Sequence, residues 1–99
     1  MIGYEERLTE DARLVILRAL LEQTGGSLNE VIIEAVLDRY GHHRSRSWVR
    51  TQLLALKDLG ALQIVEAGTV MVGTITKLGK AHVERREIID GVARPSPEV

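Results

Sequence analysis

The sequence predicts a single α+β domain that is mainly helical, and three observations lead to this prediction. Apolar residues recur with helical spacing in three segments within residues 9–59. Two β-branched runs follow, at 61–65 and 70–75, joined by a short link that contains a glycine. A further segment with helical character begins after Thr76. The expected order is three helices, a two-stranded β-hairpin and a C-terminal helix.

The first helix is expected from about Thr9 to Gln23. Its apolar stripe places Leu14, Leu17 and Leu21 at positions i, i+3 and i+7. Thr9 is the expected N-cap, because a threonine side chain can accept a hydrogen bond from a free backbone N–H in the first turn. The glycine pair that follows the helix is expected to end it, since glycine adopts the left-handed conformation at low cost.

A capping-box pattern, Ser27-x-x-Glu30, predicts the start of the second helix. In a capping box, each of the two side chains satisfies a free backbone N–H at the helix start. This helix is expected to end near Tyr40-Gly41, and a short polar connection follows it.

The third helix is expected to have an apolar face and a polar, basic face. It begins after a cap at Ser45 or Ser47 and runs to about Leu59, before Gly60. At 100° per residue, one arc holds Trp48, Val49, Gln52, Leu53, Ala55, Leu56 and Leu59. The opposite arc holds Arg46, Ser47, Arg50, Thr51, Leu54, Lys57 and Asp58. Trp48 is expected to anchor the core, and Leu54 does not fit the polar face.

The last expected helix begins after a Thr76 cap and runs from Lys77 to about Ile89. Gly91 and the prolines beyond it are expected to stop this helix. The folded domain is therefore expected to cover residues 1–93, with residues 94–99 as a flexible tail.

Charge is distributed unevenly along the chain, although the formal net charge is only −1. Residues 1–38 contain eight acidic and three basic residues, whereas residues 39–57 contain five basic residues and no acidic one. This cationic block coincides with the third helix and the loop before it. A block of this kind is either a solvated face or a surface that attracts an anionic partner.

Several classes of protein and site are not expected. The chain has no cysteine, which excludes disulfides and thiolate metal sites. No apolar run approaches the roughly 20 residues of a membrane span, and the acidic start is unlike a signal peptide, so a cytoplasmic protein is expected. His42 and His43 are loop neighbours whose side chains diverge, and His82 lies within a helix, so no metal site or other cofactor is expected. No nucleophile with a base and no carboxylate pair in a pocket is evident, so an enzyme is not expected.

Two sequence motifs resemble those of winged helix-turn-helix DNA-binding proteins. Residues 45–53 (SRSWVRTQL), followed by Leu56-x-x-Leu59-Gly60-x-Leu62, resemble their recognition helix, and residues 75–81 (ITKLGKA) resemble the exit from their wing. The resemblance is to the broad class of ArsR-like and MarR-like regulators, and it implies a two-stranded β-hairpin wing. Metal-sensing ArsR members depend on cysteine pairs, so their metal response is not implied here.

A closer resemblance covers nearly the whole chain. It is to small proteins of Mu-like phages and prophages, and it lies in residues 9–17, 27–30, 40–42, 49–51 and 91–97. This resemblance implies a phage or prophage protein of the DNA-binding kind.

The predicted function is sequence-specific binding of double-stranded DNA by a phage or prophage transcriptional regulator. In helix-turn-helix proteins the start of the second helix of the pair reads base edges in the major groove. The base contacts are therefore expected from Arg46, Ser47, Arg50 and Thr51, because arginine, serine and threonine can hydrogen-bond to bases. Contacts with phosphates are expected from Arg44, Lys57 and Lys77.

Two further expectations concern partners. A homodimer is expected through the first and last helices, because they offer spare apolar surface at Leu20, Leu21, Val83, Ile88 and Ile89. The alternative function is a winged-helix adaptor that binds another protein, in phage morphogenesis or a regulatory complex, without DNA. The hairpin link Glu66–Thr69 favours the adaptor, because it lacks the Lys or Arg that wings use in the minor groove.

Overall fold

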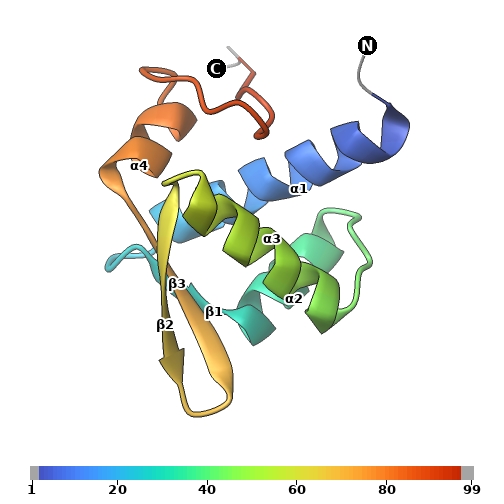
Figure 1. Ribbon diagram of the computed structural model, residues 1–99, viewed down its shortest axis with the longest axis vertical. Coiled ribbons are helices and arrows are strands. Elements are labelled where there is room, and N and C mark those ends of the chain that lie inside the picture. The colour runs from blue at the N-terminus through green and yellow to red at the C-terminus, as the bar shows by residue number, and fades with distance from the viewer. Residues whose placement is uncertain (1–2, 97–99) are drawn as a thin grey trace.

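The computed structural model describes residues 3–96 and has an α+β fold that is mainly helical (Figure 1). These residues form four helices and one three-stranded antiparallel sheet. The elements are, in chain order, α1 (Tyr4–Leu21), β1 (Ser27–Asn29), α2 (Glu30–Arg39), α3 (Arg46–Asp58), β2 (Leu62–Ala67), β3 (Val70–Ile75) and α4 (Lys77–Val83). The predicted helices and hairpin strands are all present, but the sheet has one strand more than predicted.

The first helix begins five residues earlier than the sequence predicts. Its N-cap is Gly3, and the Gly3 N–H donates to the carboxylate of Glu6 at 3.0 Å. Glu5 and Glu6 lie in the first turn, where the helix dipole favours acidic side chains. The prediction that Thr9 caps α1 is therefore wrong, because Thr9 lies inside the helix.

The predicted capping box at Ser27 is also wrong. Ser27 lies in β1, and its hydroxyl hydrogen-bonds to the Thr74 hydroxyl on β3 at 2.6 Å. The N-cap of α2 is Asn29, whose side chain accepts from the Ile32 N–H at 3.0 Å. Glu30 is the first helical residue and is fully buried. The strand was not predicted because three residues carry no detectable periodicity, and their strand pairing depends on β3.

The sheet has the order β1-β3-β2, so β3 is the central strand. The β2–β3 hairpin pairs Leu62 with Ile75 at its base and Ala67 with Val70 at its tip. Gly68 has a φ of 65°, so the tight turn uses the left-handed conformation that glycine adopts readily. The hairpin extends beyond the rest of the fold (Figure 1).

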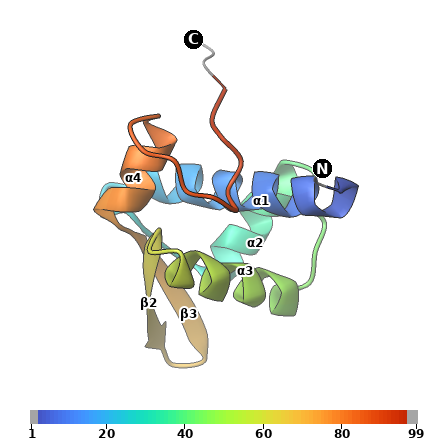
Figure 2. The same cartoon turned by 45° about the horizontal axis from the view of Figure 1, so that its top comes forward.

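A single hydrophobic core lies between α1, α2, α3 and the inner face of the sheet, and α1 runs along one side of this body (Figure 2). Its largest fully buried apolar side chains are Ile16, Leu17, Leu20, Ile33, Leu37, Leu53, Leu56 and Leu62. None of the helices formed by residues 3–96 is both long and apolar enough to cross a membrane.

The last helix is shorter than predicted, because α4 ends at Val83 instead of near Ile89. Two closing hydrogen bonds end it, from the Arg85 N–H to the His82 carbonyl (3.1 Å) and from the Arg86 N–H to the Ala81 carbonyl (2.8 Å). This pattern is the Schellman motif, in which glycine is usual at the position that Arg85 occupies with a φ of 65°. The sequence prediction missed this helix end because no glycine marks it.

The chain after α4 is irregular and returns along α1 (Figure 2). His82 is buried and holds this segment, since its Nδ1 accepts from the Ile89 N–H (3.0 Å) and its Nε2 donates to the Ala93 carbonyl (2.9 Å). The Ala93 N–H in turn donates to the Glu10 carbonyl of α1 at 3.1 Å. Pro95 is buried too, whereas residues 97–99 of the predicted tail lie outside the described residues.

This C-terminal segment changes the surface that was expected to form a dimer. Ile89 is 5% exposed and Leu20 is fully buried, so both belong to the core of one chain. Of the five apolar residues assigned to the dimer, Ile88 is the one with a large exposed fraction, 58%. The prediction that these residues are spare apolar surface is therefore wrong for Leu20 and Ile89, and the dimer stays a prediction.

We expect His82→Leu to destabilise the protein by about 2 kcal/mol, because the Ile89 N–H loses its acceptor inside the protein. Thermal unfolding followed by circular dichroism measures the change. The matched control is His43→Leu, on an exposed loop residue, which we expect to alter stability by less than about 0.5 kcal/mol. Equal melting temperatures for the two variants would contradict a role for His82 in holding the segment.

Candidate nucleic-acid interface

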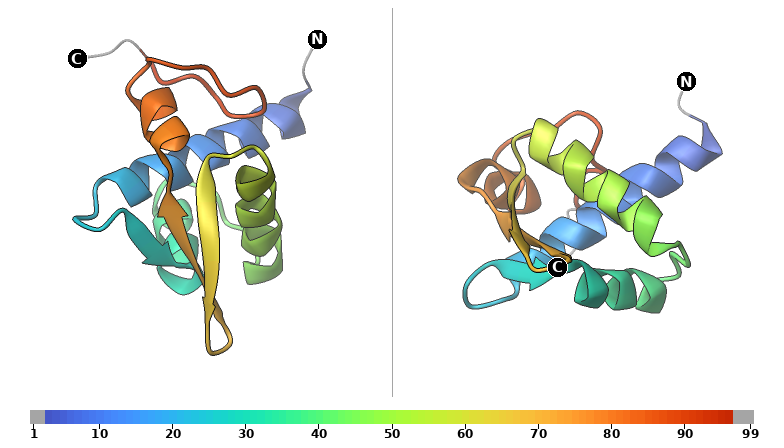
Figure 3. Two further views of the ribbon diagram at one scale, coloured as in Figure 1. Left: turned by 60° about the vertical axis from the view of Figure 1, so that its left-hand side comes forward. Right: turned by 60° about the horizontal axis from the view of Figure 1, so that its bottom comes forward.

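Helix α3 has the two faces that the sequence predicts. Ser45 caps it by accepting from the Trp48 N–H at 3.1 Å. The inward face buries Val49, Gln52, Leu53 and Leu56. The outward face exposes Arg46, Ser47, Thr51, Leu54, Lys57 and Asp58. The β2–β3 hairpin projects beside α3, so the helix and the hairpin flank one region of the surface (Figure 3).

Three of the four predicted base-reading residues are exposed on α3. The Arg46 side chain is 48% exposed, and its Nε lies 3.6 Å from the Glu34 carboxylate, which is a loose contact. Ser47 and Thr51 lie one turn apart, and the Thr51 hydroxyl donates to the Ser47 carbonyl at 3.2 Å. These three residues place an arginine and two hydroxyls on the first two turns of the helix.

The fourth predicted base-reading residue, Arg50, is held by an acidic side chain. Its Nε and Nη2 donate to the two carboxylate oxygens of Glu30, at 2.6 and 2.9 Å. Nη2 also donates to the Thr69 carbonyl at 2.7 Å. The Glu30 carboxylate further accepts from the Met71 N–H at 2.6 Å. The hydrogen bond from Arg50 is the main reason that the pKa of Glu30 is lowered from 4.5 to about 2.

Glu30 is the important residue that sequence reasoning misassigned. The capping-box interpretation placed its side chain at the helix start, facing the backbone. One feature of the sequence does indicate a buried side chain at Glu30. Glu30, Ile33 and Leu37 are spaced i, i+3 and i+7, and the last two are core residues. An acidic residue on a core stripe requires a partner, and the sequence does not identify Arg50, 20 positions away, as that partner.

The three predicted phosphate-binding residues differ in their surroundings. The Arg44 Nη2 donates to the Glu5 carboxylate at 2.9 Å, and its guanidinium lies 4.7 Å from the centroid of the Trp48 ring. Trp48 itself is half-buried and packs against the core, which confirms its predicted anchoring role. Lys57 and Lys77 are exposed, and neither forms an ion pair within residues 3–96.

Acidic residues from the first part of the chain therefore neutralise much of the cationic block. Arg44, Arg46 and Arg50 each face a glutamate, which comes from α1 for Arg44 and from α2 for the other two. The sequence places these acids in a separate segment, residues 1–38, whereas the fold brings them to the basic helix. The local charge of the surface is lower than the block alone suggests.

The histidines have structural partners. The His42 Nε2 lies 2.8 Å from the Asp11 carboxylate and links the α2–α3 loop to α1, and His43 contacts Asp38. Over residues 3–96, no group of three or more His, Asp or Glu side chains is arranged to hold a metal ion.

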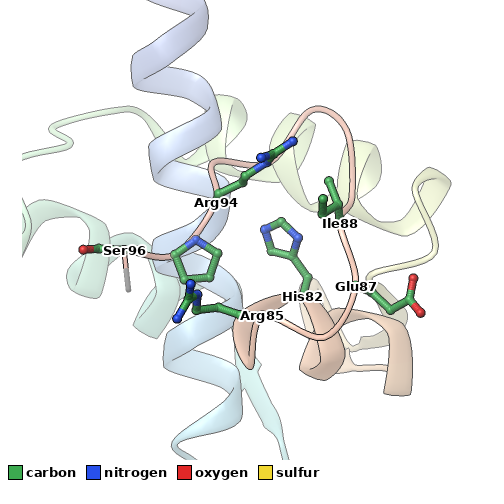
Figure 4. Close-up of a pocket in the computed structure, with 7 residues that line it drawn as sticks. His82, Arg85, Glu87, Ile88, Arg94 and Ser96 are labelled. Atoms are coloured by element: carbon green, nitrogen blue, oxygen red, sulfur yellow. The ribbon is translucent and has the colours of Figure 1, made fainter. Parts of the chain in front are cut away.

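A cavity of about 480 Å³ lies between the end of α4 and the C-terminal segment (Figure 4). It is lined by His82, Arg85, Glu87, Ile88, Arg94, Pro95 and Ser96. Arg85 and Arg94 point in different directions, and the protein backbone uses both ring nitrogens of His82. Because no charged groups converge in it, the cavity has no evident ligand chemistry.

Comparison with known proteins identifies relatives of the chain. It is 40% identical over 90 residues to gp26, an uncharacterised protein of Escherichia phage Mu, which covers 91% of this chain and 93% of gp26. The chain belongs to the phage Mu gp26 family. A second relative, an uncharacterised protein of Haemophilus influenzae, is 44% identical over 77 residues, or 77% of this chain and 74% of that protein. No family model matches the chain, and no solved structure matches it.

Membership of the gp26 family confirms the predicted resemblance to proteins of Mu-like phages. No DNA-binding family is identified for the chain, so the resemblance to the ArsR-like and MarR-like regulators stays a prediction. Both relatives are uncharacterised proteins, and the exposed surface of α3 is the feature of this chain that bears on function.

Proposed function

We propose that this protein is a winged-helix protein that binds double-stranded DNA sequence-specifically, as a transcriptional regulator of a phage or prophage. The observation that carries the proposal is the exposed start of α3. There Arg46, Ser47 and Thr51 present hydrogen-bonding groups to solvent on a helix whose other face is buried. A helix can insert into the major groove only if such a face is free.

The element order supports this proposal. The α2–turn–α3 pair is preceded by a helix and a short strand and followed by a hairpin, which is the order typical of winged helices. The hairpin lies beside α3 (Figure 3), where a wing would approach the same DNA. The hairpin turn carries no basic residue, so α3 would supply most of the contacts.

Within this proposal, Arg46 reads a base and the lysines bind phosphates. Arg46 can donate two hydrogen bonds to guanine, because its contact with Glu34 is long and half-exposed. Lys57 on α3 and Lys77 at the start of α4 are exposed, and their ammonium groups bind phosphates of the DNA backbone. Together with Arg44 they would make three phosphate contacts, which corresponds to a salt slope of about −2.7 and an affinity loss of about 40-fold between 50 and 200 mM salt.

The test is fluorescence anisotropy with the duplex upstream of the protein's own gene and a scrambled duplex, over a salt series. We expect Arg46→Ala to weaken binding to the native duplex by about 1–3 kcal/mol and to reduce the preference over the scrambled one. Arg18→Ala, which removes an exposed arginine on α1, is the control and should leave the preference intact. If the wild type binds neither duplex at low salt, the proposed function is wrong.

The adaptor alternative is favoured by the neutralised charges and by exposed apolar residues. Val31 and Ile32 on α2 are 41% and 46% exposed, and Leu54 on α3 is 44% exposed. A protein partner would bury such residues, whereas phosphate contacts would not require them. The adaptor would be supported if the wild type binds no DNA but captures a phage or host protein, and if Leu54→Asp no longer captures that protein.

A further inference from the structure

One hydrogen-bonded cluster connects three separate elements of the fold. Its centre is the Glu30 carboxylate, which is fully buried at the start of α2. It accepts two hydrogen bonds from Arg50 on α3 and one from the Met71 N–H on β3. Arg50 extends the cluster to the hairpin turn through the Thr69 carbonyl, at 2.7 Å.

The cluster uses most of the donors of Arg50. Nε gives its one N–H to Glu30, and Nη2 gives its two to Glu30 and Thr69. Within residues 3–96, Nη1 is the guanidinium nitrogen that makes no hydrogen bond. A bidentate contact with guanine needs neighbouring N–H groups on two nitrogens, and here every such pair includes a nitrogen already bound to protein.

The cluster also anchors a part of the hairpin that has few other supports. Residues 65–69, at the end of β2 and in the turn, are all exposed. Met71 lies two residues beyond Thr69 and is buried, so the contacts with Glu30 and Arg50 begin where the exposed tip ends. Moving the hairpin away from α3 would take the Met71 N–H from the buried carboxylate and the Thr69 carbonyl from Arg50, so two hydrogen bonds of the cluster would be lost while the Glu30–Arg50 ion pair remains.

We infer that Glu30 and Arg50 are positioning residues, which hold the β2–β3 hairpin at a fixed place beside α3 and leave base reading to Arg46, Ser47 and Thr51. The part of this inference that concerns bases rests on the proposed function. The part that concerns the hairpin depends only on the cluster. Arg50 is thus assigned a different role from the base contact that the sequence predicts.

The first test is amide hydrogen exchange measured by NMR. In the wild type, the Met71 amide is expected to be protected, because its N–H donates to a buried carboxylate. In Glu30→Gln, exchange at Met71 and Val70 should be at least tenfold faster, and this increase should exceed any increase at the core amides of α1. Glu34→Gln, one turn further along α2, is the matched control and should leave hairpin exchange as in the wild type.

An unprotected Met71 amide in the wild type would overturn the inference without any variant, so the test does not depend on Glu30→Gln folding. Unchanged hairpin exchange in a folded Glu30→Gln protein would overturn it as well.

The second test separates positioning from contact with DNA. A residue that binds phosphate contributes about one unit to the salt slope of DNA binding, whereas a residue that reads a base contributes to the preference for the native duplex. We expect Arg50→Gln to weaken binding to native and scrambled duplexes by a similar factor, with the slope unchanged, while Arg46→Gln lowers the preference for the native duplex. A slope reduced by about one in Arg50→Gln would overturn the inference. If the wild type binds no DNA, the proposed function fails, and the exchange data still decide whether the cluster holds the hairpin.

Discussion

Gly79→Ala is expected to destabilise the protein by about 3 kcal/mol, although alanine favours helices more than glycine does. A Cβ atom at Gly79 would lie 2.2 Å from the Ala61 carbonyl oxygen and 2.9 Å from Cγ1 of Ile75. The Ala61 carbonyl cannot move aside freely, because it accepts a hydrogen bond from the Thr76 N–H at 3.1 Å. To admit the methyl group, α4 would have to move away from the chain between α3 and β2.

The measurement is the free energy of unfolding from urea titration, compared with that of Gly25→Ala. Gly25 has no atom within 4 Å of an added Cβ, so its substitution should change stability by less than about 1 kcal/mol. Equal stability of Gly79→Ala and the wild type would show that α4 does not pack against Ala61 in the way described.

The Gly79 contact also explains the Thr76-x-x-Gly79 motif in structural terms. The Thr76 side chain accepts from the Gly79 N–H at 3.1 Å and donates to the Gly60 carbonyl at 2.6 Å. The Thr76 hydroxyl therefore caps α4 and connects this helix to Gly60, just after the end of α3. Gly79 has no side chain, which allows α4 to lie close to the Ala61 carbonyl. These contacts hold the connection between β3 and α4 in place, and this role does not depend on DNA binding.

Glu30→Ala is expected to cost about 3 kcal/mol of folding free energy and to lower the melting temperature by about 12–24 °C. The substitution removes the acceptor of the buried Met71 N–H and the partner of Arg50. It also leaves a void beside the start of α2, where Glu30 is fully buried. Thermal and urea unfolding measure the loss.

Glu34→Ala on the same helix is the matched control for this loss. Glu34 faces Arg46 at 3.6 Å with both side chains partly exposed, so its removal should cost less than about 0.5 kcal/mol. If the two alanine variants were equally stable, the buried cluster would contribute no more than a surface ion pair.

The Glu30 cluster should also make the free energy of unfolding depend on pH in the acidic range. The pKa of Glu30 is about 2 in the folded protein and 4.5 without its partners, chiefly because of the hydrogen bond from Arg50. Because the pKa of Glu30 is lower in the folded protein, its ionised carboxylate stabilises the fold at pH values above the pKa of the unfolded chain. This stabilisation is lost as the pH falls from about 4.5 towards 2. The stability difference between wild type and Glu30→Gln should therefore shrink over this interval. A difference that is the same at pH 5 and pH 2.5 would contradict an ionised Glu30 in the cluster.

Most of the elements could be predicted from the sequence because their signals are local. The apolar stripe of α1, the Ser45 cap and two faces of α3, and the glycine-containing turn of the hairpin all follow from residues within a few positions of one another. Helix ends at Gly41 and Gly60 were predictable too, since both glycines have positive φ values, of 90° and 83°.

The errors occur where a local pattern had a competing tertiary role. Ser27 begins a capping-box pattern, yet its hydrogen bond goes to Thr74 on β3. Arg85 takes a left-handed conformation that glycine usually supplies, so α4 ends early and the following chain packs on α1 instead of extending a helix. The partner of Ser27 is distant in sequence, whereas the hydrogen bonds that end α4 lie within residues 81–86.

The sequence by itself determined the mainly helical α+β class, the order of the predicted helices and hairpin, the relation to Mu-like phages, and the polar face of α3. Tertiary structure alone decided which of those polar residues are free. It pairs Arg50 with Glu30 and leaves Arg46 loosely bound and half-exposed. The physical reason is that helical periodicity fixes the direction of a side chain, whereas its available charge and donors depend on groups that folding brings from elsewhere in the chain.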